Sequence, residues 1–150
     1  MLDHVDLIGG LFAMPKRYMV DLHHVVARDK YIANTHVATA LGFVLSAALA
    51  ILVDRGKIKW DDRVIDHMPW FRMYDAWVTR EITIRDLLVH RSGLGLGQCD
   101  LMFVPRTNLT RKQTVERVAY LKPKTSFRSS YAYDNILYAV AGQLIEEGES

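Results

Sequence analysis

One long stretch of the sequence, Val37–Val53, carries no charged residue, and charges return at Asp54. A membrane-spanning helix needs about 20 apolar residues, and about 17 is the short limit. This stretch is rich in alanine and contains hydroxyl side chains and a glycine, so it is only weakly hydrophobic. We therefore predict a helix buried inside a globular protein, from about Ala38 to Asp54. Gly56 is expected to end it in a left-handed conformation.

Two capping boxes predict further helices. In such a box, a threonine or serine and the residue three positions later satisfy each other's backbone N–H groups at the start of a helix. Thr83 with Asp86 fits this pattern and is followed by an apolar face. Thr110 with Gln113 fits it as well and predicts a helix that continues to about Tyr120.

The ends of these helices have their own signals. His90 and Arg91 are expected in the last turn of the first capped helix, where cations suit the helix dipole. Gly93 is then expected to close that helix. Apolar residues at helical spacing predict a final helix that starts at Asp134 or Asn135, both good N-cap residues.

Two other segments are less regular. Residues 18–33 predict a short hairpin around a charged centre. After the buried helix, Asp61 and Asp62 are expected to cap a short helical turn that Pro69 ends. Five aromatic residues follow closely, and packing onto the core explains them better than carbohydrate stacking: Trp60, Trp70, Phe71, Tyr74 and Trp77.

Composition agrees with one soluble globular domain. Of the 150 residues, 50% are hydrophobic and 24% are charged. The 19 basic and 17 acidic residues are mixed along the chain, so no basic stripe predicts a nucleic-acid partner. Cys99 is the single cysteine, which excludes an internal disulfide. Aspartates near the N-terminus argue against a signal peptide, and the cytoplasm is the default compartment.

Metal and cofactor chemistry finds little support in the sequence. His23 and His24 are adjacent and would point to opposite faces of a strand. No HxxxH or CxxC spacing occurs, so we expect no metal site and no cofactor. The GLGLG sequence at Gly93–Gly97 lacks the flanking pattern of a phosphate-binding loop, and we predict a tight turn there.

Three segments, in this order, strongly resemble the serine β-lactamase and penicillin-binding-protein-like hydrolases, especially the esterase-like branch. They are ALAILVDRGKIKWDDRVIDHMPWF, YDAWVTREITIRDLLVHRSGL and YAYDNILYAVAGQLIE. The similarity covers about residues 47–147. It implies an α+β family fold, of which this chain holds the predominantly helical half and at most a short N-terminal hairpin. The C-terminal strands are absent, so residues 1–150 are predicted to form a single partial domain.

The resemblance also implies acyl transfer on ester, amide or β-lactam carbonyls. In such enzymes a serine attacks the carbonyl, and a lysine three residues later lies about one helical turn away on the same face. By correspondence, Tyr133 of the Y-x-N motif would be the base partner. Asn135 would be the amide that orients the substrate.

The chain departs from the family where the nucleophile belongs. Counting back from LVDRGK, the serine position falls on Thr39 and the lysine position on Gly42, and no S-x-x-K occurs in the chain. Ser46 has Leu49 three positions later, and Ser92 has no base at triad spacing in the sequence. We therefore predict a family member without the catalytic dyad, with Thr39 as a degenerate nucleophile position.

Simpler roles remain open for the same residues. Thr39 is also a good helix-start residue, and Tyr133 can serve packing alone. Two other functions stay open: a non-catalytic domain that binds a ligand or partner, and, more remotely, a membrane-anchored helical protein. We expect a small-molecule ester, amide or β-lactam as substrate if the chain is active. Apolar surface left without the C-terminal strands is expected to favour self-association.

Overall fold

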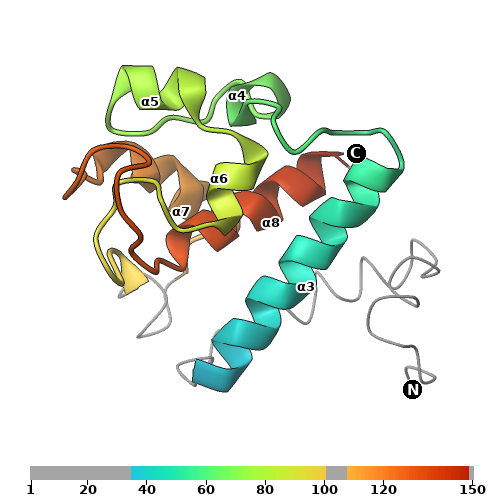
Figure 1. Cartoon of the computed structure of the whole chain (residues 1–150), viewed down its shortest axis with the longest axis horizontal. Helices are drawn as coiled ribbons and strands as arrows, with labels where there is room; N and C mark the ends of the chain where they lie inside the picture. Colours follow the sequence, from blue (N-terminus) through green and yellow to red (C-terminus); the bar gives the residue numbers. More distant parts are fainter. Residues whose placement is uncertain (1–34, 101–107, 149–150) are drawn as a thin grey trace.

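The computed structural model describes residues 35–100 and 108–148, leaving out the side chains of residues 35–41 (Figure 1). All the regular elements in these ranges are helices, and the one β-bridge among them joins Arg63 to Thr83. The described part of the chain is therefore predominantly helical, as the sequence predicts. The hairpin predicted at residues 18–33 lies outside the described residues.

Helix α3 (Thr35–Asp54) is the long helix that the uncharged stretch predicts. It ends where the N–H of Lys57 bonds the carbonyl of Leu52 at 2.9 Å, and Gly56 takes a φ of 68°. This is the Schellman arrangement, so the predicted role of Gly56 is confirmed. Leu49 and Leu52 are fully buried, which confirms a core helix. Among the described residues, no helix has the length and apolarity that a membrane crossing requires.

Helix α8 (Ile136–Gly148) is the element around which the others pack (Figure 1). It contacts α3, α4 (Val64–His67), α6 (Ile84–Leu88) and α7 (Arg111–Glu116). A helix with neighbours on several sides needs apolar residues around most of its circumference. The following apolar residues of α8 are buried: Ile136, Leu137, Val140, Ala141, Leu144 and Ile145.

Both predicted capping boxes are present. The Thr83 hydroxyl accepts the N–H of Asp86 while the Asp86 carboxylate accepts the N–H of Thr83, which opens α6. Thr110 and Gln113 make the same reciprocal pair at the start of α7. Helix α7 continues as the short 3₁₀ helix η2 (Arg117–Tyr120), so the predicted length is confirmed although the last turn is tighter.

The prediction that Asp61 and Asp62 cap the next helical turn is wrong. Helix α4 follows Arg63, whose side chain makes no capping hydrogen bond. The Asp62 carboxylate instead accepts the N–H of Lys59 at 2.8 Å and so closes the preceding turn. Asp61 pairs with Arg85 of α6, 2.9 Å away. Both carboxylates therefore have partners other than the backbone N–H groups at the start of α4.

The aromatic residues after α3 divide into two groups. Phe71 is fully buried, and Trp60 and Trp70 are partly buried against the core. Tyr74 and Trp77 are more than half exposed, beside and within helix α5 (Ala76–Glu81). The prediction of core packing therefore holds for the first three of these residues.

Candidate functional site

The site lies where the loop after α6 runs beside the loop before α8. Backbone hydrogen bonds join these two loops, residues 90–100 and 124–135, along much of their length. The donor and acceptor pairs are Lys124 N to Gly93 O, Arg128 N to Arg91 O, Ala132 N to His90 O and Gly97 N to Tyr133 O, each at 2.8 or 2.9 Å. The two family-like motifs, HRSGL and Y-x-N, are thereby held against each other.

Gly93 has a different role from the predicted one. A Cβ atom on Gly93 would lie 2.7 Å from the carbonyl oxygen of Thr125, and its φ is 93°. Helix α6 has already ended at Leu88. The prediction that Gly93 closes the helix is therefore wrong, and its glycine allows the second loop to approach. The turn predicted for Gly93–Gly97 is confirmed, because the N–H of Gln98 bonds the Gly95 carbonyl at 3.0 Å.

His90 is the centre of an aromatic cluster. Its ring centroid lies 5.7 Å from Tyr131, 4.5 Å from Tyr133 and 5.1 Å from Tyr138. Its Nδ1 accepts the backbone N–H of Asp134 at 3.4 Å. Burial lowers the pKa of His90, which favours the neutral imidazole. The prediction that His90 neutralises the end of α6 is therefore wrong.

Arg91 also has a tertiary role, because it binds Asp86 instead of the carbonyls at the end of α6. Asp86 is fully buried. Its carboxylate accepts from Thr83 N and Oγ1, Arg91 Nε, and Arg128 Nε and Nη2, at distances of 2.6 to 3.2 Å. Burial alone would raise the pKa of Asp86, but the hydrogen bonds from Arg128, Thr83 and Arg91 lower it to about 2.

The two Y-x-N residues are held in different ways. Tyr133 stacks on His90, its carbonyl accepts the N–H of Gly97, and burial raises the pKa of its hydroxyl. The Asn135 side-chain Nδ2 donates to Asp100 Oδ2 at 3.1 Å. Both side chains are partly buried. The loop that follows α6 therefore contacts both residues, through Gly97 to Tyr133 and through Asp100 to Asn135.

Asp134 lies between them, two residues before the start of α8. It is fully buried, and its Oδ1 accepts the N–H of Leu137 at 3.1 Å. Its Oδ2 has no hydrogen-bond partner among the described residues. Burial raises the pKa of Asp134 to about 6, with a further increase from the nearby charge of Asp100. Of the two N-cap candidates, the side chain of Asp134 makes the capping bond.

Both predicted dyad positions lie in α3, and Gly42 lies beside Tyr138 of the aromatic cluster. A Cβ atom on Gly42 would lie 3.0 Å from Cζ and 3.1 Å from the hydroxyl oxygen of Tyr138, whose ring also contacts His90. The space into which a side chain at position 42 would grow is therefore occupied by Tyr138. Thr39 belongs to α3, but its side chain lies outside the described ones.

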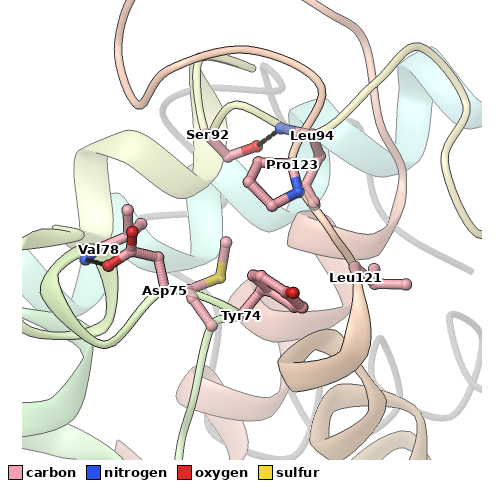
Figure 2. Close-up of a pocket in the computed structure, with 8 residues that line it drawn as sticks. Tyr74, Asp75, Val78, Ser92, Leu94, Leu121 and Pro123 are labelled. Carbon is pink, nitrogen blue, oxygen red and sulfur yellow. Dashed lines mark hydrogen bonds between the residues drawn. The ribbon is translucent and has the colours of Figure 1, made fainter.

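Ser92 does not form a second nucleophilic site. It is buried, and its Oγ accepts the N–H of Leu94 at 3.1 Å (Figure 2). It lines a cleft with Leu94, Leu121 and Pro123 whose volume is about 10 Å³. This is roughly the space that one water molecule needs. The cleft is too small for a substrate, and the hydroxyl supports the loop.

Within the described ranges, no group of three or more histidine, cysteine, aspartate or glutamate residues is arranged to hold a metal ion. His23 and His24 lie outside these ranges.

The helical core presents the Y-x-N segment beside the HRSGL loop, the two motifs by which the sequence resembles the serine hydrolases. Comparison with known families agrees, because the Beta-lactamase family model matches residues 43–148. The chain belongs to the β-lactamase family, with penicillin-binding-protein-like relatives. A second model, a domain of unknown function (DUF3483), matches residues 2–68.

Three curated relatives are each similar to part of the chain. "Penicillin-binding protein 4" of Amycolatopsis lactamdurans is 46% identical over 52 residues, or 34% of this chain and 14% of the relative. "Unguisins hydrolase ungD'" of Aspergillus campestris is 30% identical over 118 residues, or 67% of this chain and 20% of the relative. "Probable membrane-anchored ferredoxin" of Chromohalobacter salexigens is 65% identical over 49 residues, or 33% of this chain and 7% of the relative. The chain thus spans a small part of each.

The β-lactamase match begins immediately after the predicted dyad. Thr39 and Gly42 precede residue 43 and lie within the match to the domain of unknown function. Tyr133 and Asn135 lie inside the β-lactamase match. The two halves of the predicted acyl-transfer site therefore fall in segments with different similarities.

Sequence reasoning missed two residues of the site. The sequence predicts only that Tyr138 lies on the final helix. Its position about one helical turn after the Y-x-N motif is a signal that would have placed its side chain near that motif. Asp100 had no signal of its own, because a single aspartate in a loop is common. Its contact with Asn135 joins residues that are 35 positions apart.

Proposed function

We propose that this chain is a catalytically inactive member of the β-lactamase family that retains the Tyr133 and Asn135 side of an acyl-transfer site. The single observation that carries the proposal is Gly42, which offers no amine and lies against the ring of Tyr138. A glycine can neither accept a proton from a nucleophile nor position one. Threonine at position 39 adds a methyl group at the point of attack.

The family comparison supports this proposal. The match to the Beta-lactamase family model starts at residue 43, so it does not include the segment that would supply the nucleophile and the lysine. The ring of Tyr138 fills the space beside Gly42, and His90 packs against the same ring. His90 does not replace the lysine readily, because its Nδ1 already accepts a backbone N–H.

Acylation followed by intact mass tests the proposal directly. The chain is incubated with a fluorescent penicillin and with p-nitrophenyl acetate, and we expect no acyl adduct. The variant Thr39→Ser/Gly42→Lys/Tyr138→Ala introduces both groups and opens the space at position 42, and Thr39→Ser/Tyr138→Ala is the matched control without the amine. An adduct on Thr39 of the unchanged chain would overturn inactivity.

A second candidate is a non-catalytic domain that binds an ester, amide or β-lactam. The observation in its favour is that Tyr133 and Asn135 are held by His90, Gly97 and Asp100 in the absence of a dyad. A ligand that uses this site should raise the melting temperature of the chain. The rise should disappear in Tyr133→Phe and Asn135→Ala, and no rise with any of the three ligand types would exclude this candidate.

We also propose self-association through apolar surface. Seven large apolar side chains are exposed in the described part of the chain, and Leu96 and Tyr120 are 80% and 82% exposed. Their scattered positions over several elements favour weak association rather than one tight interface. Light scattering over a concentration series should show a mass that rises with concentration, and a constant monomer mass would exclude it.

A further inference from the structure

Helix α3 has one side that is covered by described residues and one side that is open. Leu49 and Leu52 are fully buried, and α8 is the helix that α3 contacts most (Figure 1). On the other side, Phe43 is 47% exposed, and Ala47 and Ala50 are partly exposed. These last three residues recur at helical spacing, so they form one continuous surface, which we call the open side of α3.

The open side carries no charge. No charged residue occurs from Val37 to Val53, on any side of the helix. A helix at a protein surface usually has charged and polar residues on the side that faces water, whereas a helix that is apolar all round is usually buried. The two alanines also allow the backbone of another segment to approach closely, because small side chains shorten the distance between packed elements. We therefore expect a further segment to cover the open side.

The comparison with known families indicates which segment this is. One family model matches residues 2–68, a range that includes residues 2–34 and the whole of α3. A family model describes a stretch of sequence that recurs as a unit, so residues 2–34 recur together with this helix. The β-lactamase match begins at residue 43 and does not include them. The segment directly before α3 is therefore the best candidate for its cover.

Residues 2–34 are long enough to reach the open side. They join α3 at Thr35, and the distance from there to Ala50 is about 22 Å at the helical rise. An extended chain spans about 3.3 Å per residue, so the segment can fold back along the helix. A tethered segment meets its site at about millimolar effective concentration, so weak contacts suffice. Its apolar side chains include Leu7, Ile8, Phe12, Val20, Val25 and Ile32.

We propose that residues 2–34 dock on the open side of α3 and complete the burial of this helix. Three observations carry the proposal: the exposure of Phe43, the uncharged length of α3, and the family match that joins the helix to this segment. The contact lies within one chain, so it does not depend on protein concentration. It is also independent of acyl transfer, so this docking and the proposed inactivity can each fail alone.

Photo-crosslinking at position 43 tests the docking in the full chain. Phe43 is replaced by p-benzoylphenylalanine, which keeps an aromatic side chain, and the products of irradiation are mapped by mass spectrometry. We expect crosslinks within one chain to residues 2–34, in a yield that does not change on dilution. The same replacement of Tyr120, which is 82% exposed on η2, is the matched control and should give few such crosslinks.

Other products would assign the open side to another occupant. Crosslinks between two chains would indicate a second copy, and crosslinks to added phosphatidylcholine vesicles would indicate a lipid surface. Either result overturns the proposal, and so does the absence of crosslinks to residues 2–34.

Hydrogen exchange followed by mass spectrometry supplies a second test. Ala50→Glu places a carboxylate on the open side, and burial of an unpaired charge is costly. We expect the backbone amides of residues 2–34 to exchange about tenfold faster in this variant, because the segment is released. Ala76→Glu is the matched control, since it makes the same change at an exposed residue of α5 and should leave this exchange unchanged.

The amides of α8 report whether the Ala50→Glu variant is folded. They should stay protected in both variants, and where they do not, the crosslinks from position 43 decide. Equal exchange of residues 2–34 in Ala50→Glu and in the unchanged chain would overturn the proposal.

Discussion

Asp86 and Asp134 are both fully buried aspartates that cap a helix, yet their surroundings have opposite effects. The Asp86 carboxylate accepts hydrogen bonds from two arginines and a threonine, and its pKa falls to about 2. The Asp134 carboxylate accepts one backbone N–H, its second oxygen has no partner among the described residues, and burial raises its pKa to about 6. Equal burial therefore gives opposite shifts, because the number and charge of the donors differ.

The difference in pKa between Asp86 and Asp134 matches where the two residues lie in the fold. Asp86 ties α6 to the loop that carries Arg128 and so holds the scaffold behind the site. Asp134 lies between Tyr133 and Asn135, in the motif that the family uses for chemistry. Incompletely paired ionisable groups concentrate at functional sites. They lower the stability of the folded chain, and well-paired groups elsewhere offset that loss.

The strongest test of this comparison is Asp86→Asn. Removal of one partner from a buried ion pair costs about 3–5 kcal/mol, because donors are left facing a neutral amide. We expect a loss of that size in urea unfolding at pH 7. Asp54→Asn, which removes an exposed aspartate, is the control and should change stability little. A loss of stability below about 1 kcal/mol would show that water hydrates the two arginines well when Asp86 is replaced.

The pH dependence of stability separates the two carboxyls. The pKa of Asp134 is raised in the folded chain, so the folded state holds this proton more tightly and stability falls as pH rises from about 4 to about 6, by about 3 kcal/mol. The pKa of Asp86 is lowered, so its contribution is lost as pH falls from about 4 toward 2. Unfolding curves from pH 3 to 8 should therefore show a maximum near pH 4. A flat profile between pH 4 and 6 would contradict the comparison.

Asp134→Asn should stabilise the chain at pH 7 by about 2 kcal/mol, since asparagine keeps an acceptor for the helix cap and removes the buried charge. The gain should vanish below pH 4, where Asp134 of the unchanged chain is protonated. Paired urea titrations at pH 7 and pH 4 measure both values. Destabilisation at both pH values would mean that neighbouring groups stabilise the ionised Asp134 carboxylate in the folded chain.

The smallest effect is expected from Thr110→Ala, which removes a capping hydroxyl that contacts no ionised group. A lost N-cap costs about 1 kcal/mol. Thr83→Ala should cost more, because the Thr83 hydroxyl also donates to Asp86 at 2.8 Å. The difference between the two variants, measured by thermal unfolding, isolates the contribution of Thr83 to the Asp86 cluster. Equal losses would assign the whole effect to capping.

The sequence alone determined the features that depend on nearby residues. The uncharged stretch predicted α3, Gly56 predicted its end, and two threonine boxes predicted the starts of α6 and α7. These predictions succeed because capping and helix periodicity act within a few positions along the chain. The ordered motifs also sufficed to identify the family, and the absence of S-x-x-K was visible without coordinates.

Tertiary structure decided the rest, since those partners are far apart in sequence. Asp86 meets Arg128 across 42 positions, and Asn135 meets Asp100 across 35. His90 was predicted at a helix end, but it packs among tyrosines, and burial there lowers its pKa and so favours the neutral imidazole. The ring of Tyr138 against Gly42 likewise follows from the packing of α8 on α3. Hydrogen bonds and pKa values depend on distance and burial, which only the folded chain defines.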